Sequence, residues 1–169
     1  MTRILLVLST TRYSKRSLEL ALAEAQEASG RGGVRLELLY IRETAAVDQV
    51  GASVDGQGFL GLEPQDEILD SLERQHHATA LRRIERFQRL GAELSGVELS
   101  FEEVQGDYQA LVRQRVLESD VDVVFLTRAD QPFVSRLLFG NKTDAVARLV
   151  RERGGKVVVS DETPPGWME

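Results

Sequence analysis

Four consecutive residues, Gly140 to Thr143, have the composition of an anion-binding helix start. Backbone amides in the first turn of a helix lack partners and carry partial positive charge, and glycine lets an anion approach without a Cβ in the way. Asn141, Lys142 and Thr143 could therefore hold a phosphate, with Arg128 as a further cation. A structural interpretation competes with this one, because Asn141 is a good N-cap and Asp144 suits the helix dipole. We favour the cap, and both roles are compatible with one helix end.

A second glycine motif, at residues 56–61, matches the dinucleotide-binding pattern G-x-G-x-x-G letter by letter. That chemistry needs the motif directly after a strand and at the opening of a helix. Here about fourteen polar residues separate the motif from the preceding apolar run, and Pro64 intervenes before the next helical pattern. We therefore interpret the motif as part of a surface loop.

The elements that must position these residues follow from hydrophobic periodicity. Short apolar or alternating runs predict strands, and apolar residues at helical spacing predict helices between them. The expected strands are Ile4 to Leu8, Val34 to Ile41, Val97 to Val104, Val121 to Leu126 and Lys156 to Ser160. The expected helices are Ser14 to Ser29, Gln65 to Leu94, a short helix that carries Leu111 to Leu117, and one that carries Val146 to Val150. The polar, glycine-containing stretch from Thr44 to Glu63 is predicted to be a long loop.

This alternation predicts an α/β domain with a single doubly wound sheet of five parallel strands, because parallel strands need crossover connections. With the strand order 3-2-1-4-5 and helices on both faces, the topological switch point lies between the first and fourth strands. Ligands of such sheets bind beyond the carboxyl ends of the strands at that point. The candidate crevice therefore includes Ser9, Ile41, Thr127 and Arg128.

Composition restricts the classes of function. The chain has 169 residues, a formal net charge of −6 and no cysteine. The negative charge argues against general nucleic-acid or anionic-membrane binding, and the lack of cysteine excludes disulfides and thiolate chemistry. No apolar run approaches a membrane-spanning length or has the form of a signal peptide. We expect a cytoplasmic protein with one domain at residues 1–161 and a proline-containing tail at residues 162–169.

Two charged clusters have structural interpretations. His76 and His77 are adjacent, so on a helix they diverge by about 100° and cannot hold one metal together. The arginines of the long helix, Arg74, Arg82, Arg83, Arg86 and Arg89, are interspersed with glutamates. We interpret them as a solvated face, with a partner-binding face as the alternative.

Taken in order, several segments make the chain resemble the universal stress protein family. The segments that carry the resemblance are residues 4–8 with 14–25, 38–41, 104–107, 121–128, 136–141 and 156–159. Members of that family that bind ATP typically carry G-x2-G-x9-G-[S/T] after the fourth strand and an aspartate at the end of the first strand.

The resemblance places the last glycine of that signature on Gly140. The first two glycines fall on Thr127 and Asp130, the Ser/Thr position falls on Asn141, and the first-strand aspartate is replaced by Ser9. The Cβ atoms of Thr127 and Asp130 obstruct backbone approach to a phosphate, and Asp130 adds a like charge. The signature is therefore largely lost.

From the resemblance and this loss we expect a non-catalytic, homodimeric stress-response protein with weak or no ATP binding and no required cofactor. Family resemblance implies a dimer through the last strand, where Val157, Val158 and Val159 would otherwise leave an apolar sheet edge unpaired. The alternative is an ATP- or AMP-binding switch that uses the same crevice. A hydrolase or transferase has little support, since no nucleophile–histidine–carboxylate set is present.

Overall fold

The computed structural model describes residues 1–44, 62–129 and 142–161, with only the backbone described at 62–65. The strands in these ranges are β1 Thr2–Ser9, β2 Val34–Glu43, β3 Val97–Gly106, β4 Val123–Arg128 and β5 Lys156–Asp161. The helices are α1 Lys15–Ser29, α3 Leu62–Gly91, α4 Tyr108–Glu118 and α6 Lys142–Glu152.

The five strands form one parallel sheet in the order β3-β2-β1-β4-β5, as the sequence predicts. Ser9 pairs with Ile41 at the carboxyl ends of β1 and β2. Thr127 lies at the corresponding end of β4 and pairs with Ser160 of β5. The register therefore brings three residues of the predicted crevice to one edge of the sheet.

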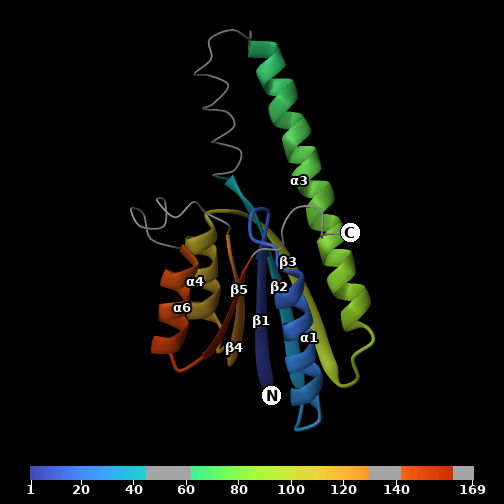
Figure 1. Ribbon diagram of the computed structural model, residues 1–169, viewed down its shortest axis with the longest axis vertical. Helices are drawn as coiled ribbons and strands as arrows, with labels where there is room; N and C mark the ends of the chain where they lie inside the picture. The colour runs from blue at the N-terminus through green and yellow to red at the C-terminus, as the bar shows by residue number, and fades with distance from the viewer. Residues whose placement is uncertain (45–61, 130–141, 162–169) are drawn as a thin grey trace.

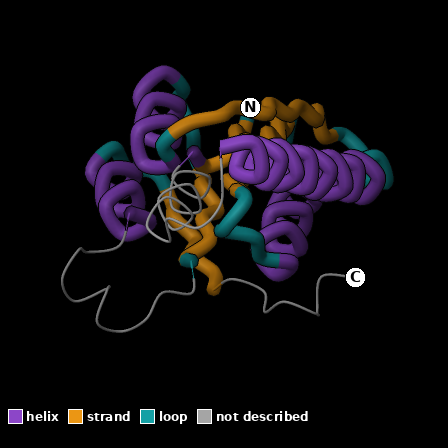
Figure 2. Tube along the Cα trace, turned by 90° about the horizontal axis from the view of Figure 1, so that it is seen from above, coloured by secondary structure: helices purple, strands orange, loops and turns teal. Residues whose placement is uncertain are grey.

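Two apolar layers enclose the sheet, with α1 and α3 on one face and α4 and α6 on the other (Figures 1 and 2). Alternate residues of one strand belong to different layers: Leu6 and Leu8 pack with α1, whereas Leu5 and Val7 pack with α4 and α6. Strands that bury both faces read as continuous apolar runs, which is why β1 and β4 were recognisable. The outer strand β3 is only partly buried, in agreement with its alternating sequence.

The N-termini of two helices are fixed by local hydrogen bonds. Ser14 accepts a hydrogen bond from the backbone amide of Ser17 at 3.1 Å. Asp107 accepts one from the amide of Ala110 at 2.9 Å. Each cap satisfies an otherwise unpaired donor of the first helical turn.

The helix α3 differs from its predicted bounds. It begins at Leu62, so the end of the predicted loop is wrong, and it ends at Gly91 rather than Leu94. Pro64 lies in the first turn, where proline removes no intrahelical hydrogen bond and can be accommodated. Most of the predicted loop, including the 56–61 motif, lies outside the described residues. The N-terminal part of α3 extends well beyond the carboxyl edge of the sheet (Figure 1).

Candidate functional site

Three of the residues that sequence analysis placed on the strand ends lie at the same edge of the sheet, and they are closed off from solvent. Ser9, Ile41 and Thr127 each have 0% of their surface exposed. Thr127 donates from its hydroxyl to the Ser17 hydroxyl of α1 at 3.3 Å. Its carbonyl oxygen accepts a hydrogen bond from Thr143 of α6 at 3.2 Å. These contacts tie β4 to helices on both faces of the sheet.

The two predicted cations at this edge both pair with carboxylates. Lys142 Nζ lies 2.5 Å from Asp107 Oδ2, across the gap between the N-termini of α6 and α4. Arg128 lies 3.3 Å from Asp144 and 3.5 Å from Asp161. All of these side chains are partly or largely exposed, so each pair is screened by water and contributes little stability. The carboxylates nevertheless offset the positive charge of Lys142 and Arg128, which a bound phosphate would need.

Gly140 and Asn141, the other two predicted anion-binding residues, lie outside the described residues. Asp144, in contrast, does occupy the first turn of α6, as the capping interpretation requires.

A buried ion pair at the same edge was not predicted. Arg12, in the turn between β1 and α1, pairs with Glu43 at the end of β2, and the two side chains are only 4% and 7% exposed. Arg12 Nη1 lies 2.5 Å from each oxygen of the Glu43 carboxylate. The hydroxyls of Ser9 and Thr11 both donate to Glu43 Oε1. The Glu43 carboxylate thus accepts hydrogen bonds from the end of β1 and from the turn after it.

These donors determine the charge state of Glu43. Burial by itself raises the pKa of the carboxyl, but hydrogen bonds from Arg12, Ser9 and Thr11 and the positive charge of Arg12 outweigh it. The net result is a pKa below the ordinary value of 4.5. Glu43 is therefore ionised at neutral pH, and Arg12 is its counter-ion.

An aromatic ring completes the surroundings of Arg12. The Cζ atom of Arg12 lies 4.3 Å from the ring centroid of Tyr108, the first residue of α4. Tyr108 is 0% exposed, and burial raises the pKa of its phenol to about 12. Its buried hydroxyl makes no hydrogen bond to a described residue. The Arg12 guanidinium thus lies between the ends of β1 and β2 and the N-terminus of α4, at the carboxyl edge of the sheet.

The solvated-face interpretation is wrong for one arginine of the long helix. Arg83 of α3 donates to the carbonyl oxygen of Ser9 at 2.9 Å and to the Tyr40 hydroxyl at 3.0 Å. Its Cζ also lies 4.2 Å from the ring centroid of Tyr13. Arg83 therefore fixes the turn that carries Arg12. Helical spacing could not reveal this, because the hydrogen-bond partners lie 43 and 74 residues earlier in the chain.

His77 of α3 contacts a carboxylate of β3. His77 Nδ1 lies 3.4 Å from Glu103 Oε1, which also lies 2.7 Å from Arg42 Nε. No cluster of three or more metal-ligating side chains occurs in the part of the chain that the structure describes. Within the same ranges, no helix is both long and apolar enough to cross a membrane.

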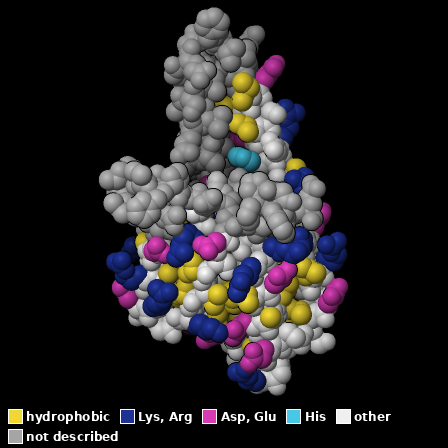
Figure 3. All heavy atoms as spheres, viewed as in Figure 1, with side chains coloured by type: hydrophobic (Ala, Val, Ile, Leu, Met, Phe, Trp, Pro, Cys, Tyr) yellow, Lys and Arg dark blue, Asp and Glu magenta, His cyan; other side chains and the backbone are white. Residues whose placement is uncertain are grey.

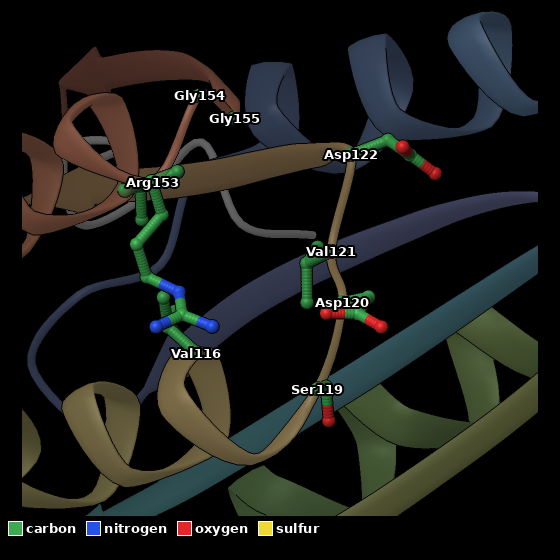
Figure 4. Close-up of a pocket in the computed structure, with 9 residues that line it drawn as sticks. Val116, Ser119, Asp120, Val121, Asp122, Arg153, Gly154 and Gly155 are labelled. Carbon is green, nitrogen blue, oxygen red and sulfur yellow. The ribbon is translucent and has the colours of Figure 1, made fainter.

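A separate cavity of about 220 Å³ lies at the opposite, amino-terminal edge of the sheet (Figure 4). It is lined by the end of α4, the start of β4 and the turn from α6 to β5. Arg153 extends toward Val116, whereas Asp122 points away from it (Figure 4) and accepts a hydrogen bond from the Arg3 amide at 2.8 Å. Helix C-termini meet here, and their partial negative charge disfavours phosphate. This cavity lacks the chemistry of a nucleotide site.

Comparison with solved structures identifies the fold. A hypothetical protein whose biochemical function was assigned from its structure matches with a TM-score of 0.61 and 14% identity, over 96% of each chain. UspA from Lactobacillus plantarum matches with a TM-score of 0.57 and 16% identity, over 94% of this chain and 96% of that one. An Arabidopsis thaliana universal stress protein family member, solved with AMP bound, matches with a TM-score of 0.54 and 16% identity over 98% and 97% of the chains. At these identities the matches establish the fold alone.

The sequence itself decides the family. The universal stress protein family model matches residues 1–151. The chain belongs to the universal stress protein family. A search of curated proteins found no match.

Within this universal stress protein, the buried Ser9 occupies the position that the resemblance assigns to the ligand-binding aspartate. Its hydroxyl donates to the chain's own Glu43, and its Oγ accepts a hydrogen bond from the Arg12 amide at 3.0 Å. Sequence reasoning missed Arg12, Glu43 and Tyr108. A signal was present: each lies within three residues of a strand's carboxyl end, where parallel strands gather their functional side chains.

Proposed function

We propose that this universal stress protein is a non-catalytic, homodimeric regulator of the cytoplasmic stress response. It acts through a protein partner and binds ATP or AMP weakly or not at all. The observation that carries the proposal is the buried Arg12–Glu43 pair at the carboxyl edge of the sheet. A phosphate or ribose directed there meets an ionised carboxylate and an already paired guanidinium.

The neighbouring charges support the same conclusion. Lys142 and Arg128, the candidate phosphate ligands, pair with Asp107, Asp144 and Asp161. A bound phosphate would have to displace these carboxylates or lie near them, which lowers its affinity. On the face seen in Figure 3, basic and acidic side chains are intermixed, which supports a protein partner rather than a nucleic acid.

Isothermal titration calorimetry with ATP and with AMP, with and without magnesium, tests this proposal. We expect no heat of binding at millimolar nucleotide. The AMP-binding Arabidopsis relative serves as the positive control. A dissociation constant tighter than roughly 10 μM, about −7 kcal/mol, would refute the proposal and favour the nucleotide-binding switch. In that case Lys142→Ala should weaken binding, since Lys142 would be a phosphate ligand.

The dimer is proposed at the outer edge of β5. Val157, Val158 and Val159 are all partly exposed. In the described sheet β5 pairs with β4 on one side, and its other side is the edge of the sheet. An apolar edge of this kind favours pairing with another strand. Light scattering at micromolar concentration should therefore give twice the chain mass of 18.8 kDa.

Val158→Lys should shift that mass to the monomer. The matched control is Phe101→Lys on the opposite edge strand β3, where Phe101 is 48% exposed. If the wild type is monomeric, or if both variants dissociate alike, the β5 interface is wrong.

A further inference from the structure

The surroundings of Arg12 combine a carboxylate, an aromatic ring and a hydroxyl acceptor around one guanidinium. A carboxylate accepts from Nη1 with both oxygens, 2.5 Å away. The guanidinium lies over the Tyr108 ring, with Cζ 4.3 Å from the ring centroid. Thr11 Oγ1 accepts a further hydrogen bond from Nη1 at 3.2 Å.

These three groups select for one ligand chemistry. The negative face of an aromatic ring attracts a cation, and a delocalised planar cation stacks on it better than an ammonium does. A carboxylate prefers guanidinium for its several N–H donors. An anionic phosphate is repelled by Glu43 and by the ring face alike. The site therefore favours cations over anions, and planar cations over ammonium ions.

We propose that the crevice at the carboxyl ends of β1 and β2 is a guanidinium-binding site whose resident ligand is the Arg12 side chain. An external ligand can enter only by displacing Arg12, and it must itself carry a guanidinium or a similar planar cation. This inference rests on the proposed nucleotide-independent function, because it assigns the same crevice to a cation.

The geometry also indicates the form of a suitable probe. Arg12 Nε is buried and makes no hydrogen bond to any described residue, so the selective contacts involve the far end of the guanidinium. Methylguanidinium carries its methyl group at the nitrogen that corresponds to Nε. It should therefore fit the space that Arg12→Ala vacates.

The experiment is a thermal melt of Arg12→Ala with millimolar methylguanidinium chloride. Methylammonium chloride and sodium chloride at the same ionic strength are the comparison salts. We expect a saturable rise in Tm of about 3 °C or more with methylguanidinium alone, because a ligand that binds only the folded state stabilises it. The wild type, whose site is occupied, should show no such rise.

Two matched variants locate the effect. Arg12→Ala/Glu43→Gln lacks the carboxylate charge and should lose the response. Arg42→Ala removes an arginine that pairs with Glu103 at the same edge of the sheet but is 29% exposed, and it should give no response. If methylguanidinium and methylammonium act alike on Arg12→Ala, or if Glu43→Gln leaves the response intact, the site is not guanidinium-selective and the proposal is overturned.

A measurement on the wild type covers the case in which Arg12→Ala does not fold. With ¹⁵N-labelled arginine, the Arg12 side-chain N–H signals should be resolved and exchange slowly with water. Arg31, 74% exposed in its pair with Glu27, is the internal reference for a solvated arginine. If Arg12 exchanges as fast as Arg31, the guanidinium is not seated and the proposal fails.

The two proposals fail separately. Nucleotide binding by the wild type would refute the proposed function. Binding of AMP, but not methylguanidinium, by Arg12→Ala would overturn the guanidinium site while leaving the wild-type function as proposed.

Discussion

Removing Glu43 should be among the most damaging single changes at the carboxyl edge of the sheet. In Glu43→Ala the Arg12 guanidinium, 4% exposed in the wild type, loses its counter-ion. Breaking a buried ion pair by removing one partner costs about 3–5 kcal/mol, because the remaining charge is left unpaired. A domain of this size has a total stability of only about 5–15 kcal/mol. Glu43→Gln, which keeps the volume and an oxygen acceptor, should cost less.

Urea denaturation followed by far-UV circular dichroism measures this loss. With a slope of about 2 kcal/mol per molar urea, a loss of about 4 kcal/mol lowers the midpoint by about 2 M. Glu98→Ala is the matched control, since it breaks the Arg35–Glu98 pair, whose side chains are 43% and 56% exposed. Exposed pairs of this kind are worth about 0–1 kcal/mol.

The dependence on pH gives an independent check. The folded-state pKa of Glu43 is lowered from 4.5, so its stabilising contribution is fully present above that value and is lost as pH falls through the folded-state pKa. The stability difference between wild type and Glu43→Gln should therefore be constant near neutral pH and shrink below 4.5. A Glu43→Ala loss no larger than that of Glu98→Ala, or a difference that grows in acid, would show that the pair is not the buried, ionised contact described above.

Three further predictions concern the face of the sheet that α4 and α6 cover. Because the pKa of Tyr108 is raised to about 12, an ultraviolet titration should show a late-ionising tyrosine that Tyr108→Phe abolishes, and wild-type stability should fall as pH rises from 10 to that value. Asp107→Ala should cost about 1 kcal/mol in urea denaturation through the lost N-cap, whereas Asp107→Asn should retain most of the stability; equal losses would contradict the capping role. Gly155→Ala would place a Cβ 2.8 Å from Val150 Cγ1, so it should lower stability by about 1–3 kcal/mol, and an unchanged urea midpoint would contradict this packing.

The elements of the fold could be predicted because their signals are local. The runs Ile4 to Leu8 and Val121 to Leu126 are continuously apolar, as strands buried on both faces must be. The alternation through Leu99 and Phe101 identified the partly exposed edge strand β3. Element bounds were less certain, and α3 began before Pro64 because proline is compatible with a first helical turn.

The candidate site could be predicted only as a region. Ser9, Ile41 and Thr127 followed from the rule that parallel strands end together; Ser9 pairs with Ile41, and Thr127 lies at the same end of β4. Their roles could not be predicted from the sequence. A serine at a strand end looks the same in the sequence whether it contacts a ligand or, as Ser9 does, a glutamate. Arg83 shows the same limit, because helical spacing places it on a charged face although it bonds to the turn after β1.

The sequence by itself determined the family and the parallel sheet, and its resemblance to the family predicts a loss of the nucleotide signature at Ser9, Thr127 and Asp130. The tertiary structure alone decided what occupies the crevice. Arg12 lies in a turn without periodicity, and Glu43 lies 31 residues later at the end of another strand. Their pairing depends on the β1–β2 register and on the path of one short turn, which Arg83 fixes from a third element. Contacts of this kind arise from the three-dimensional assembly of elements, and no local pattern in the chain encodes them.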